Sequence, residues 1–175
     1  DNTINEDGKN GGDEDDHDLA KVNVLTYDWG DLPDADGTTN PNGPEYNTDS
    51  TGTAGPSHVI FSTLRMGAAE DAELDGQPSA DATGDDVNGT PDDEDAVTLP
   101  TFLAGNPATV AVNVNNSTGS DATLYGFIDF NGNGTFEAGE TVTANVPNGT
   151  NGAVNLTFNV PVDADTVQEL GARFR

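Results

Sequence analysis

The sequence predicts an all-β protein: an antiparallel β-sandwich of jelly-roll or immunoglobulin-like type, with long acidic loops that bind calcium. From residue 96 onward, short apolar runs alternate with polar residues, as Val110, Val112 and Val114 do. A period of two gives a strand one buried and one wet face, which is the pattern of a sandwich. Acidic clusters with glycine and proline separate the runs, and one cluster has the spacing of a calcium loop.

Six strands are expected in the C-terminal half. They are rich in β-branched and aromatic residues and lack a helical period, and turns rich in asparagine and glycine occur at 115–119 and 147–152. The predicted strands cover residues 97–103, 108–115, 122–130, 141–146, 153–160 and 166–174.

The N-terminal half is expected to contain more loops. Residues 19–25, 57–61 and 64–67 have strand character, whereas residues 38–56 are rich in turn residues and predict a long surface loop. Residues 1–18 are an acidic linker, the end of a preceding repeat, or a second metal-rich stretch. The predicted organisation is one domain at 19–175, with a loop-rich acidic half at 19–95 and regular strands at 96–175.

One twelve-residue stretch, the 129–140 loop, has the spacing of a calcium-binding loop. It places oxygen ligands at positions 1, 3, 5, 7, 9 and 12, and Gly134 at position 6. Calcium takes about six to eight oxygens, so the backbone must wind around it, and glycine permits the sharp turn. The predicted ligands are Asp129, Asn131, Asn133, the carbonyl of Thr135, Glu137 and Glu140. The alternative is a polar hairpin turn whose acids are there by chance.

Strand-like residues flank this loop on both sides, at 122–128 and 141–146. Neither flank has the amphipathic period of a helix, so the loop joins two strands and not the two helices of a calcium sensor. The flanks therefore favour a structural ion over a switch.

Further acidic clusters are predicted to contribute metal ligands where the chain turns at glycine and proline. The alternative is a run of solvated charge, since like charges at this density are costly unless they are solvated or neutralised. The predicted ligands in these clusters are Asp28, Asp31, Asp34, Asp36, Asp71, Glu73, Asp75, Asp85, Asp86, Asp92, Asp93 and Asp95.

The formal net charge of −27 is the strongest global feature of the chain. It disfavours nucleic acid and anionic membranes as partners, and it calls for cations to neutralise the acids. The chain has no cysteine and therefore no disulfides, so we expect bound calcium to stabilise the fold in their place. We find no signal peptide and no apolar run that would span a bilayer. Because the chain begins inside an acidic segment, we expect a processed form or fragment of a longer exported protein.

No catalytic motif is evident, and we predict that the protein is not an enzyme. Ser57 and His58 are adjacent, but neighbours in sequence do not make a triad, and no glycine-flanked nucleophile elbow is present. His58 is expected to be a structural hydrogen-bonding residue. Carboxylates are plentiful, yet no motif places an acid and a nucleophile in one cleft.

Four aromatic residues are candidates for stacking on a sugar: Trp29, Tyr27, Tyr46 and Tyr125. The alternative for Trp29 is a half-buried anchor that holds its loop to the core. Exposed, coplanar rings would favour a carbohydrate-binding module, and buried rings would favour a structural role.

Several motifs occur in the order found in the GEVED domain, which the sequence resembles from about residue 27 to residue 175. They are DWGDLPD at 28–34, DAELDGQP at 71–78, GDD at 84–86, DDED at 92–95, IDFNGNG at 128–134 and ARFR at 172–175. The segment 17–20 is similar to the end of a prealbumin-like B repeat. The resemblance implies an extracellular, non-catalytic module of large secreted or surface proteins of bacteria, often beside adhesin-like repeats.

The sequence departs from the family pattern in two places. Asn133 stands where an aspartate is common, which weakens the calcium loop, and the sequence stops at Arg175, before the segment that names the family and would supply a last strand. From these observations we expect a calcium-stabilised structural or adhesive module of a cell-surface protein or extracellular filament. The expected partners are copies of itself, through strand addition by residues 19–25, neighbouring domains, or glycans. The alternative function is a carbohydrate-binding module.

Overall fold

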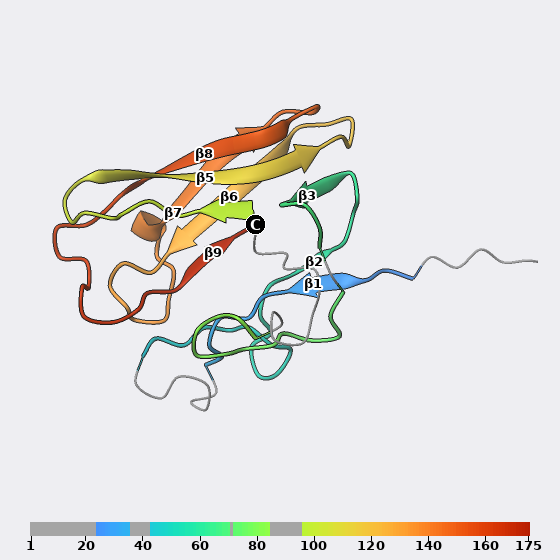
Figure 1. Ribbon diagram of the computed structural model, residues 1–175. Helices are drawn as coiled ribbons and strands as arrows, with labels where there is room; N and C mark the ends of the chain where they lie inside the picture. Colours follow the sequence, from blue (N-terminus) through green and yellow to red (C-terminus); the bar gives the residue numbers. More distant parts are fainter. Residues whose placement is uncertain (1–23, 36–42, 71, 85–95) are drawn as a thin grey trace, which may run out of the picture.

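A computed structural model of the chain describes residues 24–35, 43–70, 72–84 and 96–175 (Figure 1). Within them the protein is all-β, with antiparallel sheets and a 3₁₀ turn, η4 (Ala138–Glu140), between two strands. This arrangement confirms the predicted all-β, antiparallel class and is consistent with a β-sandwich. No helix in this part of the chain is long and apolar enough to cross a membrane.

The first sheet is built around β5 (Pro107–Asn116), the longest strand. β8 (Asn151–Asn159) pairs with it antiparallel along nearly its whole length, with Val110 opposite Leu156. Two short strands share the opposite edge of β5: β4 (Val97–Thr98) pairs near its middle and β3 (Leu64–Met66) at its end.

The second sheet has β6 (Ala122–Ile128) at its centre, between β7 (Thr141–Val146) and β9 (Ala172–Phe174). Both neighbours run antiparallel to β6, and the 129–140 loop connects β6 to β7. The loop therefore lies at one end of the sandwich, held between two adjacent strands.

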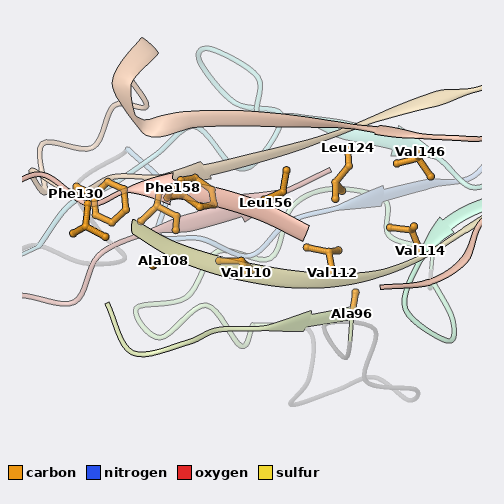
Figure 2. Packing of buried hydrophobic residues seen from close by; sticks show 12 residues of the cluster. Ala96, Ala108, Val110, Val112, Val114, Leu124, Phe130, Val146, Leu156 and Phe158 are labelled. Atoms are coloured by element: carbon orange, nitrogen blue, oxygen red, sulfur yellow. The ribbon is translucent and has the colours of Figure 1, made fainter. Parts of the chain in front are cut away.

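The core lies between the two sheets, where inward side chains of β5, β8 and β6 meet (Figure 2). Val110, Val112, Leu156 and Phe158 are at most 1% exposed. Gly126 faces them from β6, and a Cβ at this position would lie 2.6 Å from the Leu156 side chain. The absence of a side chain at Gly126 is what allows the sheets to approach so closely. The buried hydrophobic cluster comprises Ala96, Ala108, Val110, Val112, Val114, Leu124, Ile128, Phe130, Val146, Leu156, Phe158 and Val160.

The N-terminal half forms a lobe with few regular elements. Its small sheet pairs β1 (Tyr27–Trp29) with β2 (Ser57–Val59), and single bridges join Tyr27 to Glu73 and Asp34 to Tyr46. The prediction that 38–56 is only a surface loop is wrong in its second half, because Tyr46 and Thr48 are buried, at 3% and 1% exposure.

Two predicted strands are much shorter than expected. The run at 97–103 pairs only at 97–98, since Pro100 has no N–H to donate and Leu99 and Leu103 are exposed. The run at 166–174 pairs only at 172–174, because Asp165 Oδ1 accepts the N–H of Val167 and turns the chain.

The strand expected at 19–25 is described only in its last two residues. Residues 19–23 lie outside the described residues, and Val24 and Leu25 are exposed and precede the strand β1 instead of forming one. The other predicted runs overlap observed strands to within three residues at each end.

Candidate metal centre

Asp129, the first residue of the candidate calcium loop, directly follows β6 and is fully buried. Its carboxylate accepts hydrogen bonds from the N–H groups of Gly132 at 2.7 Å and Gly134 at 2.8 Å. The Asn133 N–H lies at 3.2 Å and the Tyr46 hydroxyl at 2.8 Å. A buried carboxylate is stable only when its oxygens are satisfied, and here the loop's own backbone wraps around it.

Two glycines make this winding possible. Gly132 and Gly134 have φ of 66° and 78°, in the left-handed region that other residues rarely adopt. A Cβ at Gly134 would also collide with the carbonyl of Glu45. Position 6 of the loop therefore needs glycine both for its conformation and for its contact with the N-terminal lobe.

Glu140, the last residue of the loop, joins the two ends of the loop. It is 5% exposed, and its Oε1 accepts the N–H of Phe130 at 2.8 Å and that of Asn131 at 3.3 Å. Its Oε2 accepts the N–H of Glu137 at 3.1 Å, as part of a capping box at η4. The sequence thus places one buried carboxylate at each end of the loop.

The polar side chains at positions 3, 5 and 9 converge with Glu140. Asn131 Nδ2 lies 3.1 Å from Glu137 Oε2 and 3.2 Å from Glu140 Oε1, and Asn133 Nδ2 lies 2.7 Å from Glu137 Oε1. Rotating either amide by half a turn exchanges its nitrogen for its oxygen. The same two asparagines can therefore donate to the carboxylates or present oxygens to a cation between them.

The two glutamates lie within hydrogen-bonding range of each other. Burial, followed by the neighbouring Glu137 carboxyl, raises the pKa of Glu140. Hydrogen bonding with Glu140, and then with Asn133, lowers the pKa of Glu137. Two carboxylates this close are favourable when they share a proton or when a cation neutralises them.

Tyr46 connects this loop to the rest of the molecule. Its hydroxyl donates to Asp129 Oδ2 and accepts the N–H of Gly171 at 3.0 Å, just before β9. Its ring stacks on Phe136 of the loop, with 5.0 Å between centroids. Burial, followed by the bond to Asp129, raises the pKa of Tyr46. No sequence pattern pointed to this role, since Tyr46 lies in a turn-rich stretch without periodicity.

The remaining described acids of the predicted ligand set lie mainly in the lobe, where several accept backbone N–H groups. Asp34 accepts from Thr48 and Asp49, Asp75 from Ser50 and Gly76, Asp31 from Gly84, and Glu73 from Trp29. Asp28 lies on β1, opposite His58. Within the described ranges no three histidine, aspartate or glutamate side chains form a group that could hold a metal ion. The 129–140 loop is included in this finding. There the Asp129 carboxylate accepts backbone N–H groups of the loop, and Glu137 and Glu140 lie next to each other.

The other predicted ligands Asp36, Asp71, Asp85, Asp86, Asp92, Asp93 and Asp95 lie outside the described residues. Thr135 is exposed, and its N–H bonds to Asn133 Oδ1 at 2.8 Å. The structure therefore brings the side chains at positions 3, 5, 9 and 12 of the loop together, and the other predicted metal ligands remain predictions.

Of the four aromatic residues considered as sugar-stacking candidates, Tyr46 is buried against the 129–140 loop, which favours a structural role for its ring. Tyr27 and Tyr125 are each 42% exposed, but they lie on different sheets. Trp29 is half-buried on β1, as expected of an anchor. Tyr125 stacks nearly parallel on Phe127, at 6.2 Å and 8°.

Residues 123–175 match the family model of the GEVED domain. The match covers most of β6, the whole 129–140 loop, and β7 to β9, so the resemblance noted in the sequence is confirmed for this part of the chain. No curated protein and no solved structure matches the chain.

Proposed function

We propose that this protein is a non-catalytic, calcium-stabilised structural or adhesive module of a bacterial cell-surface protein or extracellular filament. The observation that carries the proposal is the convergence of Asn131, Asn133, Glu137 and Glu140 in a loop whose first residue is a buried aspartate. Calcium would hold the ends of β6 and β7 together and would stabilise their contact with the N-terminal lobe.

The donor set suits calcium on chemical grounds. Carboxylate, amide and backbone oxygens are hard ligands, and side chains of a flexible loop can adjust to the irregular coordination that calcium accepts. The ion would separate the Glu137 and Glu140 carboxylates and offset part of a net charge of −27. Because positions 3 and 5 are neutral asparagines, we expect the Kd to be extracellular in scale, about 10⁻⁴ to 10⁻³ M or somewhat tighter.

The family match supports an extracellular setting, and the acidic composition agrees with it. The partners we propose are neighbouring domains of the same surface protein or further copies of the chain. Nucleic acid is disfavoured as a partner by the net charge.

Thermal unfolding in excess chelator and in millimolar calcium tests the proposal. A ligand that binds only the folded state adds stability that grows with the logarithm of its concentration, so calcium should raise the Tm by several degrees. Asp129→Ala should abolish most of this increase. Asp121→Ala is the matched control, because it removes an exposed loop carboxylate that accepts the N–H of Asn148 and lies at the opposite end of β6 from the 129–140 loop. Identical melting curves with and without calcium would contradict the proposal.

Carbohydrate binding is the second candidate function, and one observation favours it. Tyr125 and Phe127 present nearly parallel rings on the outward face of β6. Binding to a panel of surface polysaccharides should then be lost in Tyr125→Ala and kept in Tyr27→Ala, which removes a ring of the same 42% exposure. Equal loss in both variants would argue against the paired rings.

A further inference from the structure

β8 is the outer strand of the first sheet, with β5 on one side and no strand beyond it in the described part of the chain (Figure 1). Just past β8 the N–H of Val160 donates to the carbonyl of Asn106 at 3.2 Å, which continues the ladder with β5. Because main-chain groups alternate sides along a strand, the N–H and C=O of Ala153, Asn155 and Thr157 point away from β5. No described residue forms a backbone hydrogen bond with them.

This edge has none of the devices that usually prevent pairing with another chain. Natural edge strands are protected by charged side chains, by proline or by a bulge. β8 is 9 residues long and contains no charged residue and no proline. Its register with β5 runs without interruption from the pair Pro107–Asn159 to the pair Asn115–Asn151, so no bulge is present. An unprotected edge of this length is a template for a further strand.

The distribution of charge favours the same edge. The chain carries a net charge of −27, so most of its surface repels a second copy. The strands β4, β5 and β8, in contrast, contain no charged residue at all. Residues 96–162 have charged side chains only outside the strands, at Asp121, Asp129, Glu137 and Glu140.

The other edges of the sandwich are flanked by charge. β7 is 6 residues long and directly follows Glu140, and Asp121 accepts a hydrogen bond from Asn145 of β7 at 3.2 Å. β3 and β9 contain Arg65 and Arg173. A second copy of the chain therefore meets the least repulsion at β8.

The sequence of β8 is complementary to itself. A two-fold axis through Asn155 places the Asn155 residues of two antiparallel copies opposite each other, and Ala153 opposite Thr157. These side chains are exposed, small and uncharged, and the outward-pointing backbone groups of each pair can exchange hydrogen bonds. On the inward face Val154, which is only partly buried, would lie opposite Leu156 of the other copy. The remaining apolar surface of Val154 would then be covered.

We infer that two copies of this chain pair through their β8 edges, antiparallel and around a two-fold axis at Asn155, so that their first sheets form one continuous sheet. Such an isologous contact closes on itself and gives a dimer. The inference rests on the proposal that copies of the chain are partners, and it names the surface they use. It does not depend on the calcium site, so dimerisation is measured both in calcium and in chelator. Loss of calcium stabilisation and loss of the dimer are then separate results.

A charge at the centre of the contact provides the test. Sedimentation velocity on the full chain, from roughly 10 μM to 1 mM, should show a monomer–dimer equilibrium. Asn155→Asp places two carboxylates opposite each other and should weaken dimerisation about tenfold or more. The control Asn113→Asp adds the same charge to an exposed residue on β5, away from the edge, and should leave dimerisation unchanged. A monomer at every concentration, or equal effects of the two substitutions, would overturn the inference.

A single thiol gives a readout that does not require the charge variant to fold. The chain has no cysteine, and residues opposite each other in a bonded antiparallel pair have Cα atoms about 5.5 Å apart, a distance that a disulfide spans. With oxidised glutathione as the oxidant, Asn155→Cys should form a disulfide-linked dimer and Asn113→Cys should not. Equal cross-linking of the two variants, or none in either, would contradict the two-fold contact.

Hydrogen exchange in the parent protein identifies any other occupant of the edge. The amides of Ala153, Asn155 and Thr157 should exchange about tenfold more slowly in concentrated than in dilute solution, because only the dimer protects them. Protection that is the same at every concentration would assign the edge to another segment of the same chain and overturn the inference.

Discussion

The C-terminal sandwich and the N-terminal lobe are stabilised by different interactions. In the sandwich, inward residues of β5, β6 and β8 alternate with polar outward ones, and the apolar side chains are buried between two sheets. In the lobe the strands are three residues long or shorter, and carboxylates accept backbone N–H groups in place of a ladder. The sandwich therefore depends on the hydrophobic effect, and the lobe depends on charge-assisted hydrogen bonds.

The comparison shows how carboxylates can hold together the described part of an acidic lobe that has few regular strands. Asp34 accepts the N–H groups of Thr48 and Asp49, and Asp75 accepts both the N–H and the hydroxyl of Ser50. Each carboxylate satisfies donors that a turn would otherwise leave to water. The two regions meet at Tyr46, which bonds both to Asp129 of the loop and to Gly171 beside β9.

The largest effect is expected from a cavity in the sandwich. Phe158 is 1% exposed, so Phe158→Ala should lower the free energy of unfolding by about 3 to 5 kcal/mol. Urea denaturation monitored by circular dichroism measures this loss. Thr157→Ala, next to it on the outward face, should cost far less, because it removes only an exposed hydroxyl contact with Thr109. Similar losses in the two variants would contradict the assignment of the core.

A smaller and more local effect is expected where the regions meet. Tyr46→Phe keeps the ring but leaves the Gly171 N–H without its acceptor and Asp129 without one donor, at a cost of about 1 to 3 kcal/mol. Hydrogen exchange should accelerate at residues 43–55 while the β5 and β8 amides stay protected. Tyr125→Phe, an exposed tyrosine, is the control. Uniform acceleration across the sandwich would show that the lobe and the sandwich are one cooperative unit.

A third effect is confined to the lobe. Asp34→Ala removes the acceptor of two N–H groups and should cost about 1 to 2 kcal/mol, seen as faster proteolysis near residues 46–50. The stability of the sandwich in urea should change little. A large fall in the urea midpoint of the sandwich signal would mean that the lobe supports the sheets directly.

The smallest effect concerns pH in the metal-free protein. The folded state raises the pKa of Glu140, so its contribution to stability is full below its unfolded pKa and is lost as pH rises through its folded pKa. The folded state lowers the pKa of Glu137, so that contribution is present above its unfolded pKa and is lost as pH falls through its folded pKa.

Glu140→Gln removes the penalty of ionising Glu140, keeps an acceptor for the Phe130 N–H and offers a donor to Glu137. In chelator at pH 7 this variant should melt about 1 to 3 °C above the parent, and the difference should shrink in the acidic range. In calcium the order should reverse, because the variant loses a charged ligand. A variant that is less stable than the parent at every pH in chelator would contradict this account.

The sequence predicts the sandwich better than the lobe, for a physical reason. The alternation of apolar and polar residues from Val110 to Val114 predicts which face of the strand is buried. The fixed spacing of oxygen ligands predicts a calcium loop at 129–140. Tyr46 and Gly171 have no such local pattern, because their contact joins residues 125 positions apart. At 166–174, by contrast, the local sequence predicts more strand than the structure contains. Its residues favour a strand, but the turn at Asp165 and the contact of Gly171 with Tyr46 allow only the last three to pair.

The most direct test of the calcium site is a crystal structure of the protein grown in calcium, with anomalous data to identify the ion. We predict one calcium within about 2.3 to 2.6 Å of oxygens from the six predicted ligands, with both asparagine amides turned so that oxygen faces the ion. These ligands are Asp129, Asn131, Asn133, Thr135, Glu137 and Glu140. A loop without an ion, in which Asn131 and Asn133 still donate to Glu137 and Glu140, would contradict the account.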